Sequence, residues 1–265
     1  MIRPTGWGVC ISPQEANTHG PWVAEQALKL LKPAWYANWD VDPVAPASDT
    51  AFVPMVWGPG SDAGRVAQRL AGCPGETWLL WNEPERPDQA NMTPAEAAER
   101  SRDFLRSAWA AGHEFQWAAP GVSVNMEDRN GLLWLTEYTK DMRRHGVQRP
   151  TYWHVHGYRS RSLAEFRRSW RQFQDWYTAW GVGAPVVLSE VCAEGAGYSA
   201  QVAIMDEVDW LIKTKSIIGA GWFIATHSSR VVDWPEAALC AVDTEAQTVS
   251  LTALGQKFVQ LRGGA

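Results

Sequence analysis

Short apolar segments alternate with amphipathic segments eight times along the chain, and this alternation limits the folds that the sequence can adopt. Strands that alternate with helices build a parallel sheet, and eight such units in about 250 residues are typical of a closed (β/α)8 barrel. No long structureless loop or internal linker interrupts the 265 residues. We therefore predict an α/β protein in which residues 1–265 form a single TIM barrel.

Strands are predicted at the apolar segments and helices between them, with boundaries set by turn residues and helix caps. Thr93 with Glu96, and Ser162 with Glu165, are capping boxes that begin two of the helices. Parallel strands open their carboxyl ends on one rim of a barrel, where barrel enzymes carry their active sites. The predicted strands are 6–9, 33–39, 52–57, the start of 77–85, 115–119, 152–158, 185–190 and 218–224, and the predicted helices are 21–31, 62–71, 94–111, 132–145, 163–180, 200–215 and 252–261.

The charge and composition exclude several classes of partner. A net charge of -5 argues against nucleic acid or an anionic membrane, because each would require a basic face. No apolar run is long enough to span a membrane, and the N-terminal residues lack the apolar core of a secretion signal. The localisation is open: extracellular action after export of a longer precursor and release by lysis both fit. We expect a monomer.

The cysteines do not suggest a metal site or a disulfide framework. Their spacing contains no Cys-x-x-Cys motif, so reduced, buried thiols are the simplest expectation. The four residues are Cys10, Cys73, Cys192 and Cys240.

Two glutamates end predicted strands of this barrel. The stretch Thr77–Glu85 begins as a buried strand, the fourth, and ends in Asn82-Glu83-Pro84-Glu85. The seventh predicted strand ends at Glu190. Because both strands deliver their ends to the same rim, Glu83 and Glu190 are candidates for one paired site. We expect Glu85, which lies beyond the proline, to be a supporting or solvent-exposed acid.

Paired carboxylates are the chemistry that cleaves a glycosidic bond. One carboxylic acid protonates the leaving oxygen, and the other carboxylate attacks the sugar or activates water. When the two groups are about 5 Å apart, the second is a nucleophile and the configuration is retained. The repulsion between like charges, with partial desolvation, keeps the acid member protonated.

Four motifs in strand order resemble glycoside hydrolase family 128, whose known members cut β-1,3-glucans, within the retaining barrel glycosidases. This resemblance implies that Glu83 is the general acid/base and Glu190 the nucleophile. The sequence departs from the family pattern at residues 154–158 and at 188–192. The four motifs are Trp35-Tyr36-Ala37-Asn38-Trp39, residues 52–58, residues 82–85 and residues 93–98.

Candidate substrate-binding residues surround the two acids. The sequence has 17 tryptophans, more than packing alone would recruit, and flat indole faces stack on sugar rings. Trp39, Trp57 and Trp222 stand at or near predicted strand ends and are candidate sugar platforms. The side chains of Asn38 and Asn82 suit hydrogen bonds to sugar hydroxyls.

Two histidines on the sixth strand allow another interpretation. His154 and His156 are two residues apart, so they share a face and could ligate a metal. The early strands lack the other ligands of a barrel metallohydrolase, so no metal or organic cofactor is expected. We expect His156 and Tyr158 to orient the acids or to bind sugar hydroxyls.

The sequence predicts a retaining, endo-acting glycoside hydrolase that cleaves β-1,3-glucan, with a polysaccharide or oligosaccharide as its partner. A barrel glycosidase for another cell-wall polysaccharide is an alternative. A carbohydrate-binding barrel that has lost turnover is another, although the presence of both acids speaks against it.

Overall fold

The computed structural model describes residues 3–72, 75–110, 112, 115–124, 130–158, 160–227 and 234–263. The strands of its parallel sheets are β1 (Gly6–Cys10), β2 (Trp35–Ala37), β3 (Ala51–Phe52), β4 (Met55–Val56), β5 (Thr77–Leu80), β6 (Gln116–Ala118), β7 (Val122–Ser123), β8 (Trp153–His156), β9 (Val186–Val191) and β10 (Gly219–Trp222). The helices are α1 (Pro13–His19), α2 (Trp22–Leu31), α3 (Ala63–Gly72), α4 (Pro94–Ala110), α5 (Asn130–Arg144), α6 (Leu163–Trp180), α7 (Tyr198–Lys213) and α8 (Ala253–Gly263).

The parallel strands close into a barrel. One sheet has the order β3-β2-β1-β10-β9-β8-β7, and a second has the order β4-β5-β6. β3 and β4 are two parts of one barrel strand, interrupted at Pro54, which has no amide hydrogen to donate to the ladder. β6 and β7 are likewise separated at Pro120, and a bridge between Ala118 and Tyr152 joins β6 to the strand that follows. The described residues therefore contain the eight strands of a TIM barrel, as predicted.

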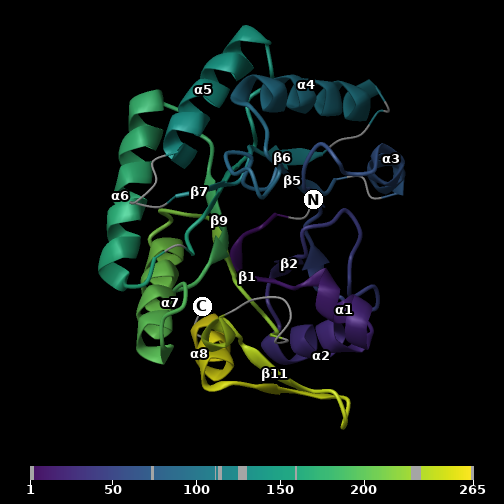
Figure 1. The fold of residues 1–265 in the computed structure, drawn as a ribbon, viewed down its shortest axis with the longest axis vertical. Helices are drawn as coiled ribbons and strands as arrows, with labels where there is room; N and C mark the ends of the chain where they lie inside the picture. The colour runs from purple at the N-terminus through teal and green to yellow at the C-terminus, as the bar shows by residue number, and fades with distance from the viewer. Residues whose placement is uncertain are drawn as a thin grey trace.

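The helices form a ring around the strands (Figure 1). The hydroxyl groups of both predicted capping boxes cap their helices: Thr93 Oγ1 accepts a hydrogen bond from the Glu96 amide at 3.2 Å, and Ser162 Oγ accepts one from the Glu165 amide at 3.3 Å. The apolar stripe of α6 packs on the core through Phe166, Trp170, Phe173 and Trp176. Trp180, at the end of the same helix, is only partly buried.

Trp35 fills the interior of the barrel where two glycines leave room for its ring. A Cβ atom on Gly8 would lie 2.3 Å from Trp35 Cδ2, and one on Gly221 would lie 2.9 Å from Trp35 Cη2. A second, larger core lies between the outer face of the strands and the helices. Gly8 on β1 and Gly221 on β10 thus leave the space in the interior that the indole ring of Trp35 fills.

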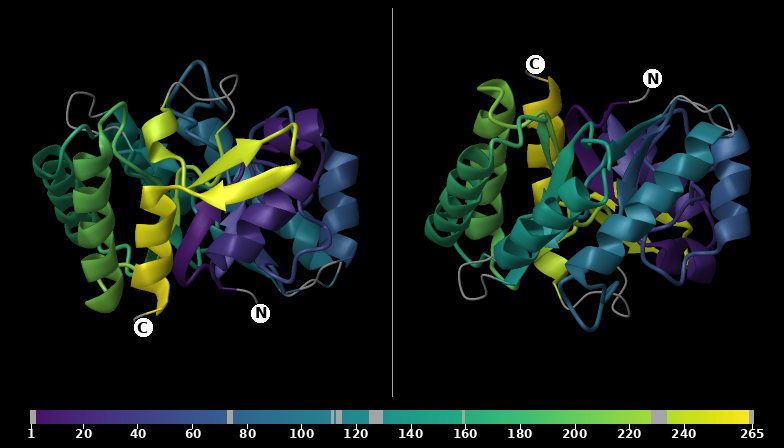
Figure 2. Two further views of the ribbon diagram at one scale, coloured as in Figure 1. Left: turned by 90° about the horizontal axis from the view of Figure 1, so that it is seen from below. Right: turned by 90° about the horizontal axis from the view of Figure 1, so that it is seen from above.

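Several described elements were not expected from the sequence, among them a short 3-10 helix, η1 (Pro235–Ala237). Helix α1 follows β1, and an antiparallel hairpin of β11 (Cys240–Asp243) and β12 (Thr248–Leu251) precedes α8. The hairpin lies across the outside of the barrel near α2 and α8, and the two chain termini lie at the same end of the molecule (Figure 2). Gln26 fixes the hairpin to α2, because its side chain donates to the Gln247 carbonyl at 3.2 Å and accepts from the Val249 amide at 3.0 Å.

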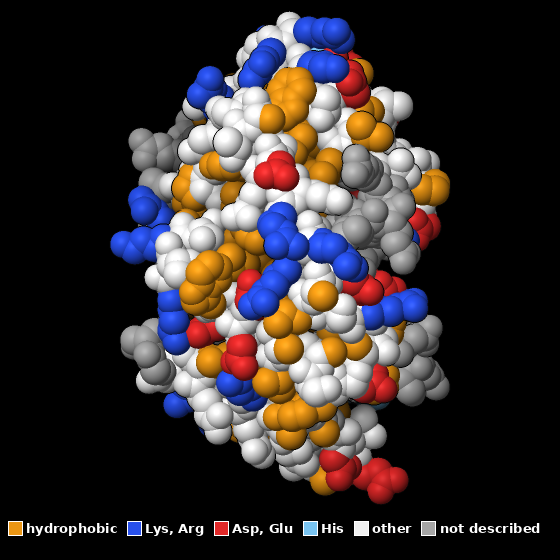
Figure 3. Space-filling view, turned by 90° about the vertical axis from the view of Figure 1, so that its left-hand side faces the viewer, with side chains coloured by type: hydrophobic (Ala, Val, Ile, Leu, Met, Phe, Trp, Pro, Cys, Tyr) orange, Lys and Arg blue, Asp and Glu red, His pale blue; other side chains and the backbone are white. Residues whose placement is uncertain are grey.

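The outer face formed by α6 and α7 carries charges of both signs. Figure 3 shows Lys and Arg side chains interspersed with acids and hydrophobic side chains on this face. Arg167 pairs with Glu207 at 2.6 Å, and the Arg143 guanidinium lies over the Trp180 ring at 5.6 Å. Over the part of the chain that the structure describes, no helix has the length and apolar character needed to cross a membrane.

Candidate active site

Glu83 and Glu190 lie in one pocket at the carboxyl ends of β5 and β9. Glu83 follows β5 with a left-handed φ of +40°, an uncommon conformation for a residue other than glycine. Its amide donates to the Gly121 carbonyl at 2.7 Å, which holds this backbone in place. Both residues are buried, with exposed fractions of 1% for Glu83 and 4% for Glu190. The pocket has a volume of about 350 Å³ and is lined by Ser12, Pro13, Gln14, Trp39, Trp57, Asn82, Glu83, Gln89, Tyr158, Glu190, Phe223 and Ile224.

The ring of His156 lies between the two carboxyl groups. Its Nδ1 is 3.2 Å from Glu83 Oε1, and its Nε2 is 3.4 Å from Glu190 Oε1. The Tyr158 hydroxyl donates to Glu83 Oε1, and the Trp39 indole donates to Glu190 Oε1 at 2.6 Å. Each carboxyl group therefore has an aromatic donor of its own, and one imidazole contacts both.

Burial and charge act in opposite directions on this group of side chains. Burial raises the pKa of Glu190, and the charge of Glu83 raises it further, while His156 and the Trp39 hydrogen bond act against the rise. Burial alone would lower the pKa of His156, but Glu190 and Glu83 outweigh it and the pKa is raised. Burial and the two carboxylates raise the pKa of Tyr158, so it stays a neutral donor. The site therefore favours a protonated imidazole beside two acids.

Glu85 is a third acid beside this pair. Its Oε1 accepts a hydrogen bond from the Ser123 amide at 2.7 Å, while its Oε2 is buried without a hydrogen-bond partner among the described residues. Burial, followed by the charge of Glu83, raises the pKa of Glu85 to about 7. Arg86 lies between Glu83, at 3.4 Å, and Asp88, at 2.7 Å.

Three of the predicted substrate-binding residues line the pocket besides Tyr158. Trp39 and Trp57 are half-buried, so each leaves part of its ring accessible. Asn82 is held by its Nδ2, which donates to Gln89 Oε1 at 3.0 Å. Its Oδ1 is buried without a hydrogen-bond partner in the described residues, and it can accept a hydrogen bond from a hydroxyl.

Two other predicted residues do not reach the pocket. Trp222 has an exposed fraction of 0%, and its indole donates to the Ala237 carbonyl at 2.8 Å on the helix side of β10. Neighbouring residues on a strand point to opposite faces, so it is Phe223, one residue later, that lines the pocket. Asn38 is also fully buried, and its side chain donates to the Asp42 carbonyl at 2.8 Å. Neither residue can present its side chain to a sugar in this conformation.

Several pocket residues were not predicted. Ser12, Pro13 and Gln14 come from the start of α1, where Ser12 Oγ accepts from the Gln14 amide at 3.3 Å. Ser-Pro before a short polar segment is a helix-start signal that could have identified this element. Gln89 and Ile224 lie on loops after β5 and β10, and no local signal in the sequence marks them.

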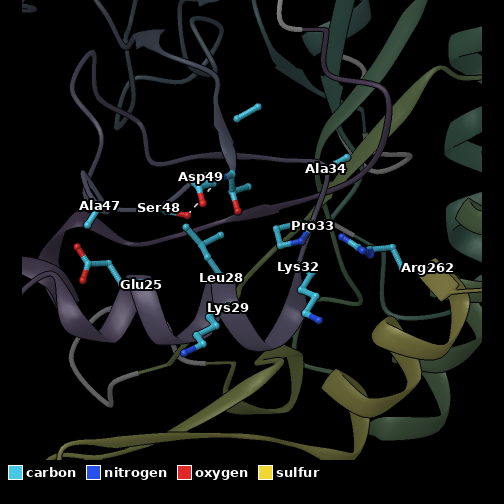
Figure 4. A pocket seen from close by; sticks show the side chains of 12 residues that line it. Glu25, Leu28, Lys29, Lys32, Pro33, Ala34, Ala47, Ser48, Asp49 and Arg262 are labelled. Carbon is cyan, nitrogen blue, oxygen red and sulfur yellow. Dashed lines mark hydrogen bonds between the residues drawn. The ribbon is translucent and has the colours of Figure 1, made fainter.

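A larger hollow, of about 660 Å³, lies at the opposite end of the barrel (Figure 4). It is formed at the amino ends of β2 and β3. In TIM barrels this end usually serves stability, and the active site lies at the carboxyl ends of the strands. Its cations Lys29, Lys32 and Arg262 lie at the ends of α2 and α8, where positive charge offsets the negative end of a helix dipole. We therefore do not assign the reaction to it.

The described cysteines are thiols in the interior. Cys10, Cys192 and Cys240 are buried and free, as expected, and burial raises the pKa of each thiol, to about 12 for Cys240. Cys73 lies outside the described residues. Among the residues that the structure describes, no group of three or more His, Cys, Asp or Glu side chains is placed to hold a metal ion.

Comparison with known proteins identifies the family. The family described as "Glycosyl hydrolase catalytic core" matches residues 16–258. No curated protein matches the chain.

Several solved structures have the same fold. A family 128 (subgroup II) endo-β-1,3-glucanase from Sorangium cellulosum has 20% identity and a TM-score of 0.69, with 98% of each chain covered. A subgroup I endo-β-1,3-glucanase from Amycolatopsis mediterranei, in complex with laminaritriose, has 20% identity and a TM-score of 0.70, covering 97% of this chain and 99% of that one. A subgroup VI exo-β-1,3-glucanase from Aureobasidium namibiae has 19% identity and a TM-score of 0.74, covering 95% and 96%.

These findings confirm the family resemblance that the strand motifs indicated. The match over residues 16–258 extends from α1 to α8 and includes both buried glutamates. The chain belongs to the glycosyl hydrolase catalytic core family, it has the barrel fold of the family 128 structures, and it is a glycoside hydrolase.

Proposed function

We propose that this glycoside hydrolase cleaves β-1,3-glucan internally, with retention of configuration, through a double displacement. The observation that supports the proposal most strongly is the pair of buried carboxyl groups, Glu83 and Glu190, in contact with the same His156 ring. The structures with the same fold include endo-β-1,3-glucanases, one of them bound to laminaritriose, which supports a β-glucan substrate. A paired acid and carboxylate is the chemistry that glycosidic cleavage requires.

In the first step Glu190 attacks the anomeric carbon while Glu83 protonates the leaving oxygen. The bond from the anomeric carbon to the leaving oxygen breaks, and a glycosyl ester of Glu190 forms. In the second step Glu83, now ionised, takes a proton from water, and the water oxygen displaces Glu190 from the anomeric carbon. Both carboxyl groups then return to their initial states.

The neighbouring side chains suit these roles. The contacts of Trp39 and His156 with Glu190 are both to Oε1, so we assign the attack to Oε2. His156 Nδ1 lies beside Glu83 Oε1, and the raised pKa of His156 keeps a proton at this position. His156 and Glu83 therefore share a proton, and Glu83 delivers it to the leaving oxygen.

We assign substrate binding to Trp39, Trp57, Asn82 and Tyr158, which line the pocket, with His156 orienting the two acids. Asn38 and Trp222 are withdrawn from this set because both are fully buried. We propose a monomer with one catalytic domain over residues 1–265, and no nucleic acid or membrane partner.

Two matched variants test the assignment of roles. Glu190→Ala should abolish hydrolysis of laminarihexaose with the circular dichroism spectrum intact, and azide should restore turnover with an activated substrate to give an inverted glycosyl azide. Glu83→Ala should be rescued by azide to give the azide of retained configuration, because the covalent intermediate still forms. Wild-type activity in Glu190→Ala would refute the mechanism, and exchanged azide configurations would exchange the two roles.

The substrate needs a separate test. Release of reducing sugar from laminarin, but not from xylan, mannan, chitin or peptidoglycan, would support the β-1,3-glucan assignment. Activity on another of these polysaccharides would move the assignment to that polymer. Binding of laminarin without release of product would support a carbohydrate-binding barrel.

A further inference from the structure

His154 lies inside the barrel on β8, and its ring joins two strands that are not neighbours. Its Nδ1 is 2.9 Å from Ser189 Oγ on β9, and its Nε2 is 3.2 Å from the Leu80 carbonyl oxygen on β5. β9 pairs with β8 and β10, whereas β5 pairs with β4 and β6. The ring therefore links the strand that carries Glu190 to the strand that leads into Glu83.

The partners of the ring fix its protonation state. A backbone carbonyl can only accept a hydrogen bond, so Nε2 of His154 carries the hydrogen. Nδ1 then has a lone pair and accepts from the Ser189 hydroxyl. Burial lowers the pKa of His154 to about 3, and the charge of the neighbouring His156 contributes to this decrease. The His154 ring is therefore neutral near pH 7.

Ser189 is the additional residue of a β-bulge directly before Glu190. In the pairing of β8 with β9, Val155 lies opposite Leu188 and the next residue, His156, lies opposite Glu190. A regular strand would point the side chains of Ser189 and Glu190 to opposite faces. A bulge changes the direction of a side chain locally, and here both turn to the face that His154 and His156 share.

Other strands enclose the bulge. The Cys10 thiol on β1 donates to the Ser189 carbonyl oxygen at 3.2 Å. A Cβ atom on Gly221 of β10 would lie 2.5 Å from the same oxygen, and one on Gly121 would lie 2.3 Å from His154 Cε1. The glycines at these two positions leave the space that the bulge and the histidine ring occupy.

We propose that His154 is a positioning residue that, through Ser189, fixes the β9 bulge and so sets the separation of Glu190 from Glu83. His154 touches neither carboxyl group by a hydrogen bond, so it acts through the strands that carry them. This inference rests on the proposed function, because the separation of the two carboxyl groups matters through the reaction that they share.

Ser189→Ala tests the link with a small change, since it removes the hydroxyl and keeps the bulge residue. A displacement of about 1 Å in an active site can cost about 100-fold in rate, so we expect kcat on laminarihexaose to fall by about 10- to 100-fold with KM little changed. The charge of Glu83 is one of the causes that raise the pKa of Glu190, so a wider separation of the two carboxyl groups should lower the pKa of Glu190. The limb of the pH profile of kcat/KM that reports Glu190 should therefore move to lower pH.

Thr139→Val is the matched control. Thr139 Oγ1 is a buried hydroxyl that donates to the Leu135 carbonyl at 2.7 Å within α5, away from the rim. Both variants should lower the melting temperature, but only Ser189→Ala should change kcat and the pH profile. A Ser189→Ala protein that loses stability and keeps the wild-type kcat and pH profile would overturn the proposal.

NMR of the histidine ring nitrogens tests the link without activity or a variant. The wild-type spectrum should contain a neutral His154 with its hydrogen on Nε2, unchanged through the acid limb of the pH profile. Titration of His154 near neutral pH, or hydrogen on Nδ1, would overturn the proposal. Absence of laminarihexaose hydrolysis by the wild type would instead contradict the proposed function and leave this readout valid.

Discussion

Glu85→Gln isolates the cost of placing a third acid beside the pair Glu83 and Glu190. The amide has nearly the shape of the carboxyl group and can still accept the Ser123 hydrogen bond through its oxygen. It cannot ionise. The difference between the two proteins therefore reports the ionisation of Glu85, whose Oε2 is buried without a hydrogen-bond partner in the described residues.

The size and sign of the effect follow from the raised pKa. The pKa of Glu85 rises from 4.5 to about 7, a shift of about two and a half units worth about 1.4 kcal/mol each. Between these values the folded state holds a proton that the unfolded state has lost, so the stability of the wild type falls as the pH rises through this window. Above pH 7 the ionised Glu85 costs the folded state at most about 3.5 kcal/mol.

Thermal unfolding of both proteins between about pH 4 and pH 8 measures this cost. The two melting temperatures should nearly agree at the acid end. At the neutral end Glu85→Gln should melt up to about 7 to 14 °C higher, since 1 kcal/mol corresponds to about 2 to 4 °C in a protein of this size. Glu236→Gln, the same change at an exposed acid, is the control.

A difference that does not depend on pH would refute the reasoning, because it would come from packing and not from a proton. A variant less stable than the wild type at neutral pH would show that the Glu85 carboxylate is stabilised in the fold. The nearby His156 offers a second readout. The charge of Glu85 is one of those that raise the pKa of His156, so loss of that charge should lower the pKa of His156.

Two further substitutions test contacts of the site. Trp39→Phe keeps an aromatic ring but removes the donor to Glu190 Oε1. It should lower kcat/KM on laminarihexaose by about 10- to 100-fold, since a hydrogen bond to a charged group contributes about 1.5 to 3 kcal/mol. Unchanged kinetics would mean that the indole only packs. Gly121→Ala places a Cβ 2.3 Å from His154 Cε1 and 2.8 Å from His156 Nε2, so chemical denaturation should show a loss of about 1 to 3 kcal/mol. Gly60→Ala, where a Cβ would meet nothing within 4 Å, is its control.

The barrel could be predicted because its signals are local. Apolar strands, capping boxes at Thr93 and Ser162, and the helical stripe of α6 each depend on residues a few positions apart. The hairpin of β11 and β12 was missed although its own strand pairing is local, and the contacts that attach it to the barrel are distant in sequence. Gln26 on α2 binds residues 247 and 249, and no pattern within the hairpin indicates that helix as its partner.

The candidate site could be located at the ends of two strands, but the direction of each side chain there could not be predicted. The rule that parallel strands end on one rim brings Glu83 and Glu190 together, and a motif can identify both. Whether Trp222 or Phe223 faces the pocket depends on a register of one residue, which reverses the face that each side chain occupies. A strand end located to within a residue or two cannot make this distinction.

The direction of the Glu190 side chain is still harder to predict from the sequence. Alternation along a regular strand would place Ser189 and Glu190 on opposite faces, and only the bulge allows both to face inward. The groups that hold the bulge, His154 and Cys10, come from β8 and β1, 35 and 179 residues away along the chain. A bulge leaves no periodic signal in its own strand, so the orientation of the proposed nucleophile is encoded by the residues that enclose it. Substitutions at those positions should therefore change catalysis without touching either carboxyl group.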